Sequence, residues 1–475
     1  MSEAANQNAE LQPAIEAANI MLYCADWVLP ITSQPIADGA LAVAGERLIA
    51  VDQRAKLEAA YPHATRRIYP DAVIIPGLVN SHSHLELSVM RGYLEVEEGE
   101  FFAWLRKLTR ARLDLLTPDD LSISAAWGAI EAARAGITCV GDASDNAHLA
   151  LRAVKEVGLR GIVYQEVFGP DARTAGAQFE KLREKISVLR EMENNLARAG
   201  VSPHAPYTVS GPLLQVVARY AREENLPLMM HAAESLAEKM FVRDGTGPFA
   251  ENLQSRNIEW RATGLSSIAY LAGLGVLESK PLFAHCVTVD ERDLELIVAA
   301  GAKIAHCPKS NAKLGHGAAP LIEFLRSGVT FGLGSDSVAS NNTVDLIEEA
   351  RFALLSARAR APRTDLALND EQVLNASRML AAATLGGARA LFEEINVNSL
   401  VAGQFADFAV VSLGGAQQLP VYDPVAALIF ASSGRDVLLT VVAGREIYRE
   451  GRMTTTDEER VRARVREIGK KLGAF

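Results

Sequence analysis

The chain has 475 residues, of which 49% are hydrophobic and 22% are charged. This composition is typical of a folded globular protein and excludes a predominantly disordered one. The formal net charge of −10 argues against nucleic acid as the main partner, because phosphate binding needs a basic surface. No run reaches the roughly 18 apolar residues of a membrane span, and the polar N-terminus lacks the features of a secretory signal. The sequence therefore predicts a soluble cytoplasmic protein with no membrane partner.

The four cysteines are scattered and include no Cys-x-x-Cys pair. A disulfide framework is not expected in so long a chain. We predict small buried thiols in a reducing cytoplasm, at Cys24, Cys139, Cys286 and Cys307.

Both ends of the chain contain short β-prone segments, from about residue 17 to 75 and from about residue 403 to 453. Gly, Asp and Pro bound these runs, as is usual at strand ends. Neither group is long enough to form a stable domain alone. We predict that residues 1–75 and 399–475 form one small β-sandwich, to which the C-terminal part adds an exposed amphipathic helix.

The middle of the chain, residues 76–398, alternates between apolar strand-like runs and helix-like segments. The eight runs are AVIIPGLVNSH, ITCVGDA, RGIVYQEV, GVSPHAPY, LPLMMHAAE, PLFAHCV, AKIAHCP and VTFGLGSD. Alternation of this kind predicts parallel βα units, and eight units over roughly 270 residues match a (β/α)8 barrel. Helices from about residue 369 to 399 should lead to the last β segment. A doubly wound open sheet is the alternative, but it does not explain why polar residues end nearly every strand.

Histidines fall at the ends of most of these predicted strands. The first strand ends with His82 and His84, and later strands end with His204, His231, His285, His306 and Asp336. In a (β/α)8 barrel all strand C-termini face one mouth, where the active site lies. Six of the nine histidines and one aspartate are therefore predicted to converge on one cavity.

The segment His82-Ser83-His84 has the spacing of two ligands for one metal ion, because alternate side chains of a strand point to the same face. A single pair of this kind is a weak signal by itself. A third histidine and a carboxylate would complete a site for zinc and leave one position for water. Such a ligand set also leaves iron and manganese open.

The chain resembles the amidohydrolase superfamily over nearly its whole length. The segments that carry the resemblance are PGLVNSHSH, PHAPYTVS, HAAES, AHCVTVD, HCPKSNAKLGHG and GLGSDSVASNN. They are similar to the mononuclear branch, which deaminates or dechlorinates aminated heterocycles. The resemblance implies one metal ion bound by His82, His84, His231 and Asp336, with His285 beside the activated water. It also implies a homodimer as a reasonable oligomeric state.

Glu234 follows His231 by three residues and is placed to act as a general acid/base. It would take a proton from the water and protonate a ring nitrogen. The alternative is a solvated glutamate at a helix start. His285 would hold the attacking water, and Asp336 would serve as both ligand and proton acceptor.

Related binuclear enzymes use a carbamylated lysine at the end of the fourth strand. No lysine occurs between Lys185 and Lys239, which argues against that type of centre. Glu166, at the end of the third strand, is an alternative bridge to a second ion.

The segments HSHLELS, EFFAWLRKLTRAR and HAAES, with GTGPFAENL, look most like aminodeoxyfutalosine deaminases of the alternative menaquinone pathway. The resemblance implies a substrate such as 6-amino-6-deoxyfutalosine, an adenine nucleoside with a carboxyphenyl extension. One departure is HAAES where HLAES is usual, a change in packing. Deaminases of S-adenosylhomocysteine or methylthioadenosine are the nearest alternative, and guanine deaminases and triazine chlorohydrolases are more distant. A metal-free scaffold relative is the non-enzymatic alternative.

Several residues are candidate substrate contacts. His204 resembles the histidine that contacts the base in purine-type deaminases. Glu86 fits either a contact to a ribose hydroxyl or a loop salt bridge, and Arg91 or Arg106 would meet the carboxylate. Four further residues fit a pocket role or a purely structural one: Trp104, Ser310, Asn311 and His316.

Overall fold

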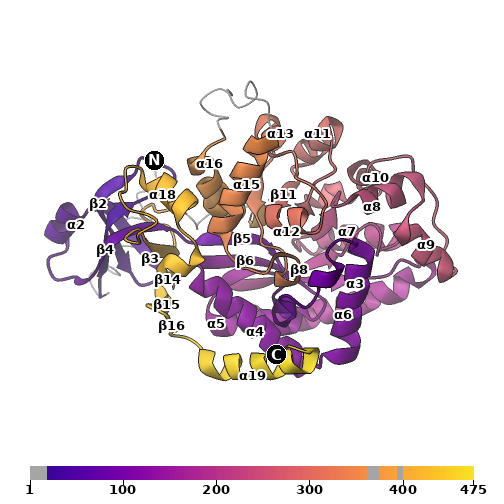
Figure 1. Ribbon diagram of the computed structural model, residues 1–475, viewed down its shortest axis with the longest axis horizontal. Helices are drawn as coiled ribbons and strands as arrows, with labels where there is room; N and C mark the ends of the chain where they lie inside the picture. The colour runs from indigo at the N-terminus through magenta and orange to yellow at the C-terminus, as the bar shows by residue number, and fades with distance from the viewer. Residues whose placement is uncertain (1–18, 361–373, 393–398, 475) are drawn as a thin grey trace.

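The computed structural model describes residues 19–360, 374–392 and 399–474. The larger part of the protein consists of strands surrounded by helices. It lies beside a smaller sheet built from the two ends of the chain (Figure 1). The polar N-terminal segment, and parts of the helices predicted between residues 369 and 399, lie outside the described residues.

Eight parallel strands form the large part, in two four-stranded sheets. Their bounds are β5 (Leu78–Ser83), β6 (Ile137–Ser144), β7 (Arg160–Val167), β8 (Ala197–Pro203), β9 (Met229–Ala232), β10 (Leu282–His285), β11 (Lys303–His306) and β12 (Phe331–Leu333). Two single parallel bridges, Val201 with Leu228 and Ser83 with Asp336, join the sheets on both sides. The strands therefore close into a barrel, and the predicted α/β fold is confirmed.

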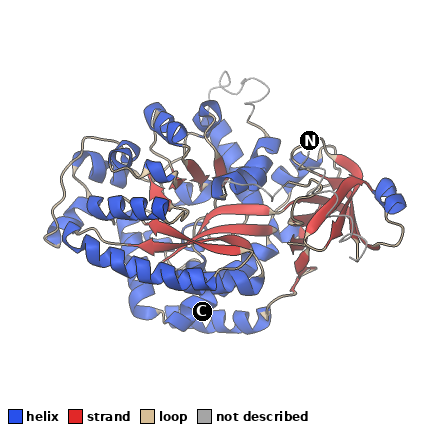
Figure 2. Cartoon of the chain, turned by 180° about the vertical axis from the view of Figure 1, so that it is seen from behind, coloured by secondary structure: helices blue, strands red, loops and turns tan. Residues whose placement is uncertain are grey.

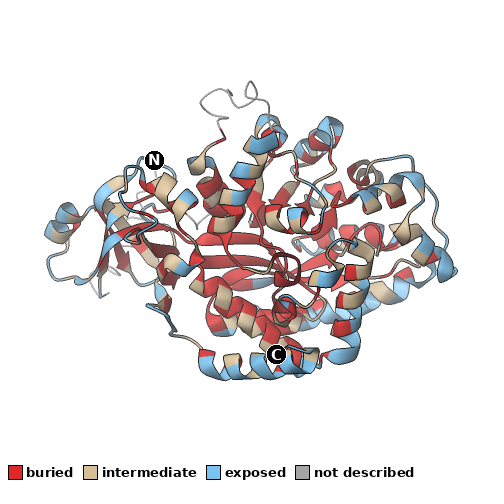
Figure 3. Cartoon of the chain, viewed as in Figure 1, coloured by how far each residue is buried: buried red, intermediate tan, exposed pale blue. Residues whose placement is uncertain are grey.

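The barrel strands are apolar because both of their faces are covered. Every residue of β6 and β7 is buried, and Figure 3 shows the strands buried inside a ring of helices whose outer faces are exposed. The covering helices include α4 (Pro118–Arg134), α5 (Ala147–Val157), α6 (Ala175–Met192), α7 (Gly211–Glu223), α11 (Glu291–Ala300), α13 (Leu321–Ser327) and α15 (Leu346–Arg360). Local sequence sets their ends: Thr117 and Asp120 form a capping box at the start of α4, with Pro118 in the first turn.

The remaining helices are shorter or lie outside this ring. They are α2 (Arg54–Ala60), α3 (Phe101–Arg110), α8 (Leu236–Lys239), α9 (Pro248–Ser255), α10 (Ser267–Gly273), α12 (Pro308–Lys313), α14 (Val338–Asn341), α16 (Ala376–Ala381), α17 (Gly387–Leu391), α18 (Pro424–Ala431) and α19 (Glu458–Leu472). The last of these runs against α4 (Figure 1), where Arg464 pairs with Asp119 at 2.9 Å. No helix in the described part of the chain combines the length and the hydrophobicity needed to cross a membrane.

The smaller sheet joins strands from both ends of the chain (Figure 1), in the order β16-β15-β14-β13-β4-β1-β2-β3. Figure 2 shows these strands as a separate group beside the helix-ringed part. The strands are β1 (Met21–Val28), β2 (Ile36–Ala44), β3 (Arg47–Gln53), β4 (Thr65–Pro76), β13 (Phe408–Ser412), β14 (Val437–Val442), β15 (Arg445–Arg449) and β16 (Arg452–Met453). Arg47 bridges to Phe405, just before β13, so the edge strand β3 curls back towards the middle of the sheet. The domain limits after residues 75 and 398 stay a prediction.

The run AVIIPGLVNSH, predicted as one strand, is two strands that belong to different sheets. β4 ends at Pro76 and β5 begins at Leu78. A Cβ atom on Gly77 would lie 2.0 Å from the Thr138 hydroxyl oxygen, so glycine is needed where the chain passes into the barrel. Nearby, the buried pair Arg160–Asp407, at 2.7 Å, links β7 to the segment before β13.

Candidate active site

The carboxyl ends of the barrel strands open into a cavity of about 1110 Å³. This is the face on which barrel enzymes carry their active sites. One wall consists of side chains at the carboxyl ends of the strands or just after them: His84, Glu166, His204, His231, Glu234, His285 and Asp336. The other wall consists largely of α3 and of the π-helical turn that follows it, Ala111–Leu115.

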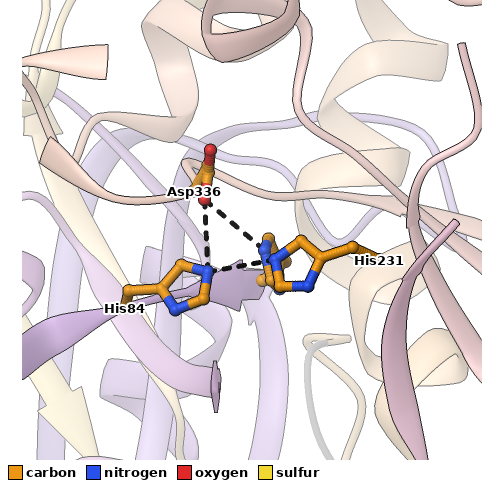
Figure 4. A group of neighbouring side chains, drawn as sticks. His84, His231 and Asp336 are labelled. Atoms are coloured by element: carbon orange, nitrogen blue, oxygen red, sulfur yellow. Dashed lines mark hydrogen bonds and ion pairs between the residues drawn. The ribbon is translucent and has the colours of Figure 1, made fainter. Parts of the chain in front are cut away.

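Four side chains at the bottom of this cavity could hold a metal ion. His82 and His84 come from β5, His231 from β9, and Asp336 follows β12, and their ligand atoms all lie within 4.8 Å of one another. His84 Nε2 is 3.2 Å from His231 Nε2 and 3.4 Å from Asp336 Oδ1, and Figure 4 shows these three side chains pointing toward one another. His82 Nε2 is 3.5 Å from the same aspartate oxygen.

The protonation states of these side chains suit the binding of a divalent cation. Burial lowers the pKa of His82 and His84, and lowers that of His231 to about 4, so the rings are neutral and offer lone pairs. Burial alone would raise the pKa of Asp336, but the nearby His82, His285 and His84 hold it well below its usual range. The buried Nε2 of His82 has no hydrogen-bond partner in the described chain. Since an unpartnered buried nitrogen is costly, three imidazoles and a carboxylate around one point suit a metal ion.

Hydrogen bonds hold two of the four side chains, Asp336 and His231, from outside the ligand group. Ser310 and Ser340 each donate a hydroxyl hydrogen bond of 2.6 Å to Oδ2 of Asp336, which leaves Oδ1 facing the histidines. His231 Nδ1 lies 2.9 Å from the backbone oxygen of His204, so its Nε2 is free to face the cavity. Partners of this kind orient metal ligands and fix the tautomers of histidines.

The backbone is unusual at the same strand ends. Ala233, His285, Cys286 and Asp336 have φ angles of 54°, 75°, 49° and 55°. Non-glycine residues seldom adopt this left-handed region, and such positions cluster at functional sites. The conformation turns the chain sharply where the barrel strands β9, β10 and β12 end.

Glu234, just after β9, lies at the edge of the four-ligand group. Its Oε1 is 3.6 Å from His285 Nε2 and 3.5 Å from His316 Nε2, and Tyr207 donates its hydroxyl to Oε2 at 3.3 Å. Burial alone would raise the pKa of Glu234, but His285, His316 and His231 outweigh it and lower the pKa to about 2. The carboxylate is therefore ionised at neutral pH and able to accept a proton.

His285 is held by its other ring nitrogen. Nδ1 lies 2.8 Å from the side-chain oxygen of Asn311, and the buried Nε2 has no hydrogen-bond partner among the described residues. Burial lowers the pKa of His285, but the charges of Glu234 and Asp336 outweigh it and raise the pKa overall. A ring in this state can donate a hydrogen bond into the cavity.

An acidic cluster around Arg112 also lines the cavity. Glu86 lines the cavity, but its carboxylate also accepts hydrogen bonds from the backbone nitrogens of Asp145 and Asn146, at 3.1 and 3.2 Å. Arg112 Nη1 lies 3.6 Å from Glu86 and 3.9 Å from Glu166. Glu86 thus combines a position on the cavity with contacts to a loop, the two alternatives expected from the sequence.

The structure does not bring two of the expected residues to the cavity. Arg91 pairs with Glu131 and with the backbone oxygen of Asn342, and it lines a separate cavity. The 3-10 helix Leu85–Met90 carries the chain away from the barrel mouth before Arg91 is reached. His306 is buried and absent from the lining of the large cavity, because alternate strand residues face opposite ways.

Other expected residues do line the cavity. His204, Trp104 and Arg106 are among its lining residues, and His204 Nδ1 bonds to the hydroxyl of Thr208 at 2.8 Å. Sequence reasoning missed Ser340 and Arg112, and it left open whether His316 has a pocket role or a structural one. Ser340 lies four residues after Asp336, a spacing from which a contact between the two could have been predicted. No local sequence pattern identifies Arg112 or His316 as part of the site.

Glu166, His204 and His231 form a second group that could hold an ion. It shares His231 with the first group, and that ring uses Nδ1 for the backbone contact described above. One imidazole cannot serve both positions at once, so an ion in the first group leaves only two side chains for the second.

The barrel, the strand-end ligand group and the neighbouring carboxylate define a hydrolase of the metal-dependent (β/α)8 class. The sequence profile of the amidohydrolase family matches residues 73–447. The chain therefore belongs to the amidohydrolase family, in a deaminase branch, and is a hydrolase that acts on carbon–nitrogen bonds.

Three known proteins show the extent of the similarity. A 5-methylthioadenosine/S-adenosylhomocysteine deaminase from Nitratidesulfovibrio vulgaris is 32% identical over 436 residues, 91% of this chain and 92% of the relative. An adenosine deaminase from Xanthomonas campestris with bound zinc is 27% identical, with a TM-score of 0.81, over 95% of this chain and 98% of that one. An aminofutalosine deaminase from Helicobacter pylori, in complex with methylthio-coformycin, is 22% identical with a TM-score of 0.74, over 90% of this chain and 100% of that one. This last likeness concerns the fold alone.

Proposed function

We propose that this protein is a metal-dependent hydrolytic deaminase of adenosine derivatives of the 5′-methylthioadenosine and S-adenosylhomocysteine type. The observation that carries the proposal is the placement of Glu234, ionised and in contact with His285, at the edge of the four-ligand group. Hydrolytic deamination needs a group that takes a proton from water and returns it to the substrate. The 32% identity to a methylthioadenosine/S-adenosylhomocysteine deaminase supports the substrate class.

The proposed ligands of a single divalent ion are His82, His84, His231 and Asp336. Zinc is the first candidate because it favours three histidines and a carboxylate with one open position, and iron and manganese are the alternatives. When bound, such an ion lowers the pKa of a water molecule towards about 7, so that water can attack near neutral pH.

The side chains around this group then move the protons. Glu234 accepts one proton from the attacking water and delivers it to a nitrogen of the purine ring, while the water oxygen bonds to the carbon that carries the amino group. His285 donates a hydrogen bond to that oxygen. Asp336 accepts the second proton and passes it to the amino group, which leaves as ammonia. One water is consumed, and a ring carbonyl replaces the amino group.

The cavity suits a nucleoside with a substituent. Its volume of about 1110 Å³ is slightly above the roughly 300–1,000 Å³ usual for small-molecule sites. His204 is the proposed contact to the base, and Glu86 the proposed contact to ribose hydroxyls. The exposed Arg106 and Arg256 also line the cavity, and neither side chain forms an ion pair or hydrogen bond with a described residue. They would suit the carboxylate of S-adenosylhomocysteine.

A second candidate substrate is 6-amino-6-deoxyfutalosine, which would place the protein in menaquinone biosynthesis. The observation that favours it is a set of aromatic rings in the cavity, at Phe101, Phe102, Tyr207 and Phe249. Tyr207 and Phe249 stack with their ring centroids 4.1 Å apart. Such rings suit the carboxyphenyl group of that substrate.

The test is ammonia release by the purified, metal-loaded protein. The panel contains adenosine, 5′-methylthioadenosine, S-adenosylhomocysteine, 6-amino-6-deoxyfutalosine, guanine and a chlorinated triazine. We expect the highest kcat/KM for methylthioadenosine or S-adenosylhomocysteine. No ammonia from any adenine nucleoside would overturn the proposal, and protein that neither contains metal nor gains activity from it would favour a scaffold role. Light scattering of the same preparation tests the expected homodimer.

A further inference from the structure

The loop after α12 brings one more histidine beside Glu234. His316 lies in the segment KLGHG, between Gly315 and Gly317, whose φ angles are 70° and 97°. Glycine adopts this left-handed conformation without strain, so the chain bends sharply on both sides of His316. Both glycines are exposed, yet the His316 side chain is only 4% exposed. A surface loop therefore directs this imidazole inward.

The inward end of the imidazole faces Glu234. His316 Nε2 lies 3.5 Å from Oε1 of Glu234 and has no hydrogen-bond partner in the described chain. His285 Nε2, equally buried and unpartnered, lies 3.6 Å from the same oxygen. Two imidazoles from separate segments thus converge on one carboxylate oxygen, at distances that can tighten when a substrate binds.

Two contacts hold His316 in this orientation. The rings of Phe101 and His316 meet edge to face, with centroids 4.5 Å apart and planes at 84°, an arrangement that aromatic rings favour. The backbone nitrogen of His316 donates to the backbone oxygen of Asn311 at 2.8 Å. Because the side chain of Asn311 also holds His285, one residue ties together the two histidines that face Glu234.

We propose that His316 is a positioning residue for Glu234, and that together with His285 it holds Oε1 in place for proton transfer. The inference rests on the proposed function, which assigns that transfer to Glu234. With its proton on Nε2, the His316 ring donates toward Oε1 and stabilises the carboxylate. The other titratable groups near Glu234 include His285, His231, Tyr207, Glu238 and His82, and all five remain when His316 is replaced.

The first test compares His316→Ala, His316→Gln and His316→Asn as metal-loaded proteins. The amide nitrogen of glutamine can reach the position of Nε2, whereas that of asparagine is too short. We expect kcat to fall about 10- to 100-fold in the alanine and asparagine variants, less than the roughly 10²–10⁴-fold of a lost general acid/base. The glutamine variant should recover most of kcat, KM should change less than kcat, and metal content should stay at the wild-type level.

A second test needs no substrate. Infrared difference spectra over a pH titration report protonation of the Glu234 carboxyl, whose band is identified by its loss in Glu234→Gln. His316 lowers the pKa of Glu234, so in His316→Ala the protonated band should appear at a higher pH than in the wild type. The acidic limb of kcat/KM should move in the same direction. His148→Gln, a half-buried histidine on α5 outside the cavity, is the matched control.

These measurements separate the two proposals. If no adenine nucleoside releases ammonia, the proposed function fails, and the infrared titration still decides whether His316 acts on Glu234. A Glu234 band that titrates at the same pH in wild type and His316→Ala would overturn the inference. So would equal kcat in the glutamine and asparagine variants, loss of metal, or a change confined to KM. A failure of the alanine variant to fold leaves the glutamine–asparagine pair to decide.

Discussion

The two walls of the cavity are built in different ways. The wall of strand ends is anchored in the barrel, and its ligands are held from behind by buried contacts such as those of Ser310 and Ser340 to Asp336. The wall of α3 lies outside the barrel, and its polar contacts, such as Lys107–Glu97, are partly exposed. The first arrangement suits chemistry, which needs exact distances, and the second suits substrate selection, which tolerates variation. Mutations in the first wall should therefore abolish turnover, and mutations in the second should change which substrate is used.

The largest effect is expected for His231→Ala. This change removes one of the four proposed ligands and leaves an unfilled position in the buried ligand group. Both metal content and ammonia release should fall to background, as measured by elemental analysis and a turnover assay. His148→Gln should keep both at the wild-type level. Full activity of His231→Ala would break the distinction between the two walls.

Glu234→Gln, in the same wall of strand ends, should reduce turnover and leave metal binding intact. Glutamine keeps the size of the side chain but cannot accept and return the proton. We expect the wild-type metal content and a decrease in kcat of about 10²–10⁴-fold. A variant that turns over at the wild-type rate would remove Glu234 from the mechanism.

Ser310→Ala and Ser340→Ala should weaken metal binding without removing a ligand. Each deletes a hydrogen bond of 2.6 Å to Oδ2 of Asp336, which lets the carboxylate rotate. We expect metal affinity to fall about 10- to 100-fold in each variant, measured by competition with a chelator. Ser356→Ala, on α15 and away from the cavity, is the control, and equal affinities in all three would contradict the proposed support.

The smallest effect is expected on the other wall, for Arg106→Gln. An exposed charge pair contributes about 0.2–1 kcal/mol, so KM for S-adenosylhomocysteine should rise only about two- to fivefold. KM for uncharged 5′-methylthioadenosine should not change. Arg183→Gln, on α6 outside the cavity, is the matched control. An equal rise in KM for both substrates would show that Arg106 does not recognise the carboxylate of S-adenosylhomocysteine.

The sequence by itself determined the barrel and most of the strand-end wall. Apolar runs that alternate with helical segments specify parallel βα units, and the period of two along a strand places His82 and His84 on one face. The three-residue spacing between His231 and Glu234 could be recognised from the sequence in the same way. These are local patterns, and a closed parallel barrel turns the ends of separate strands into one site.

Only the tertiary structure showed which residues from outside the strand ends line the cavity or contact its side chains. Arg91 and Arg106 are both plausible from the sequence, yet only Arg106 lines the cavity. His306 ends a strand as His285 does, but only His285 lines the cavity, whereas His316 reaches Glu234 from a loop between two glycines. The direction of such a side chain depends on partners such as Phe101, more than 200 residues away in sequence. No local period encodes contacts of that range, because packing of distant segments selects them.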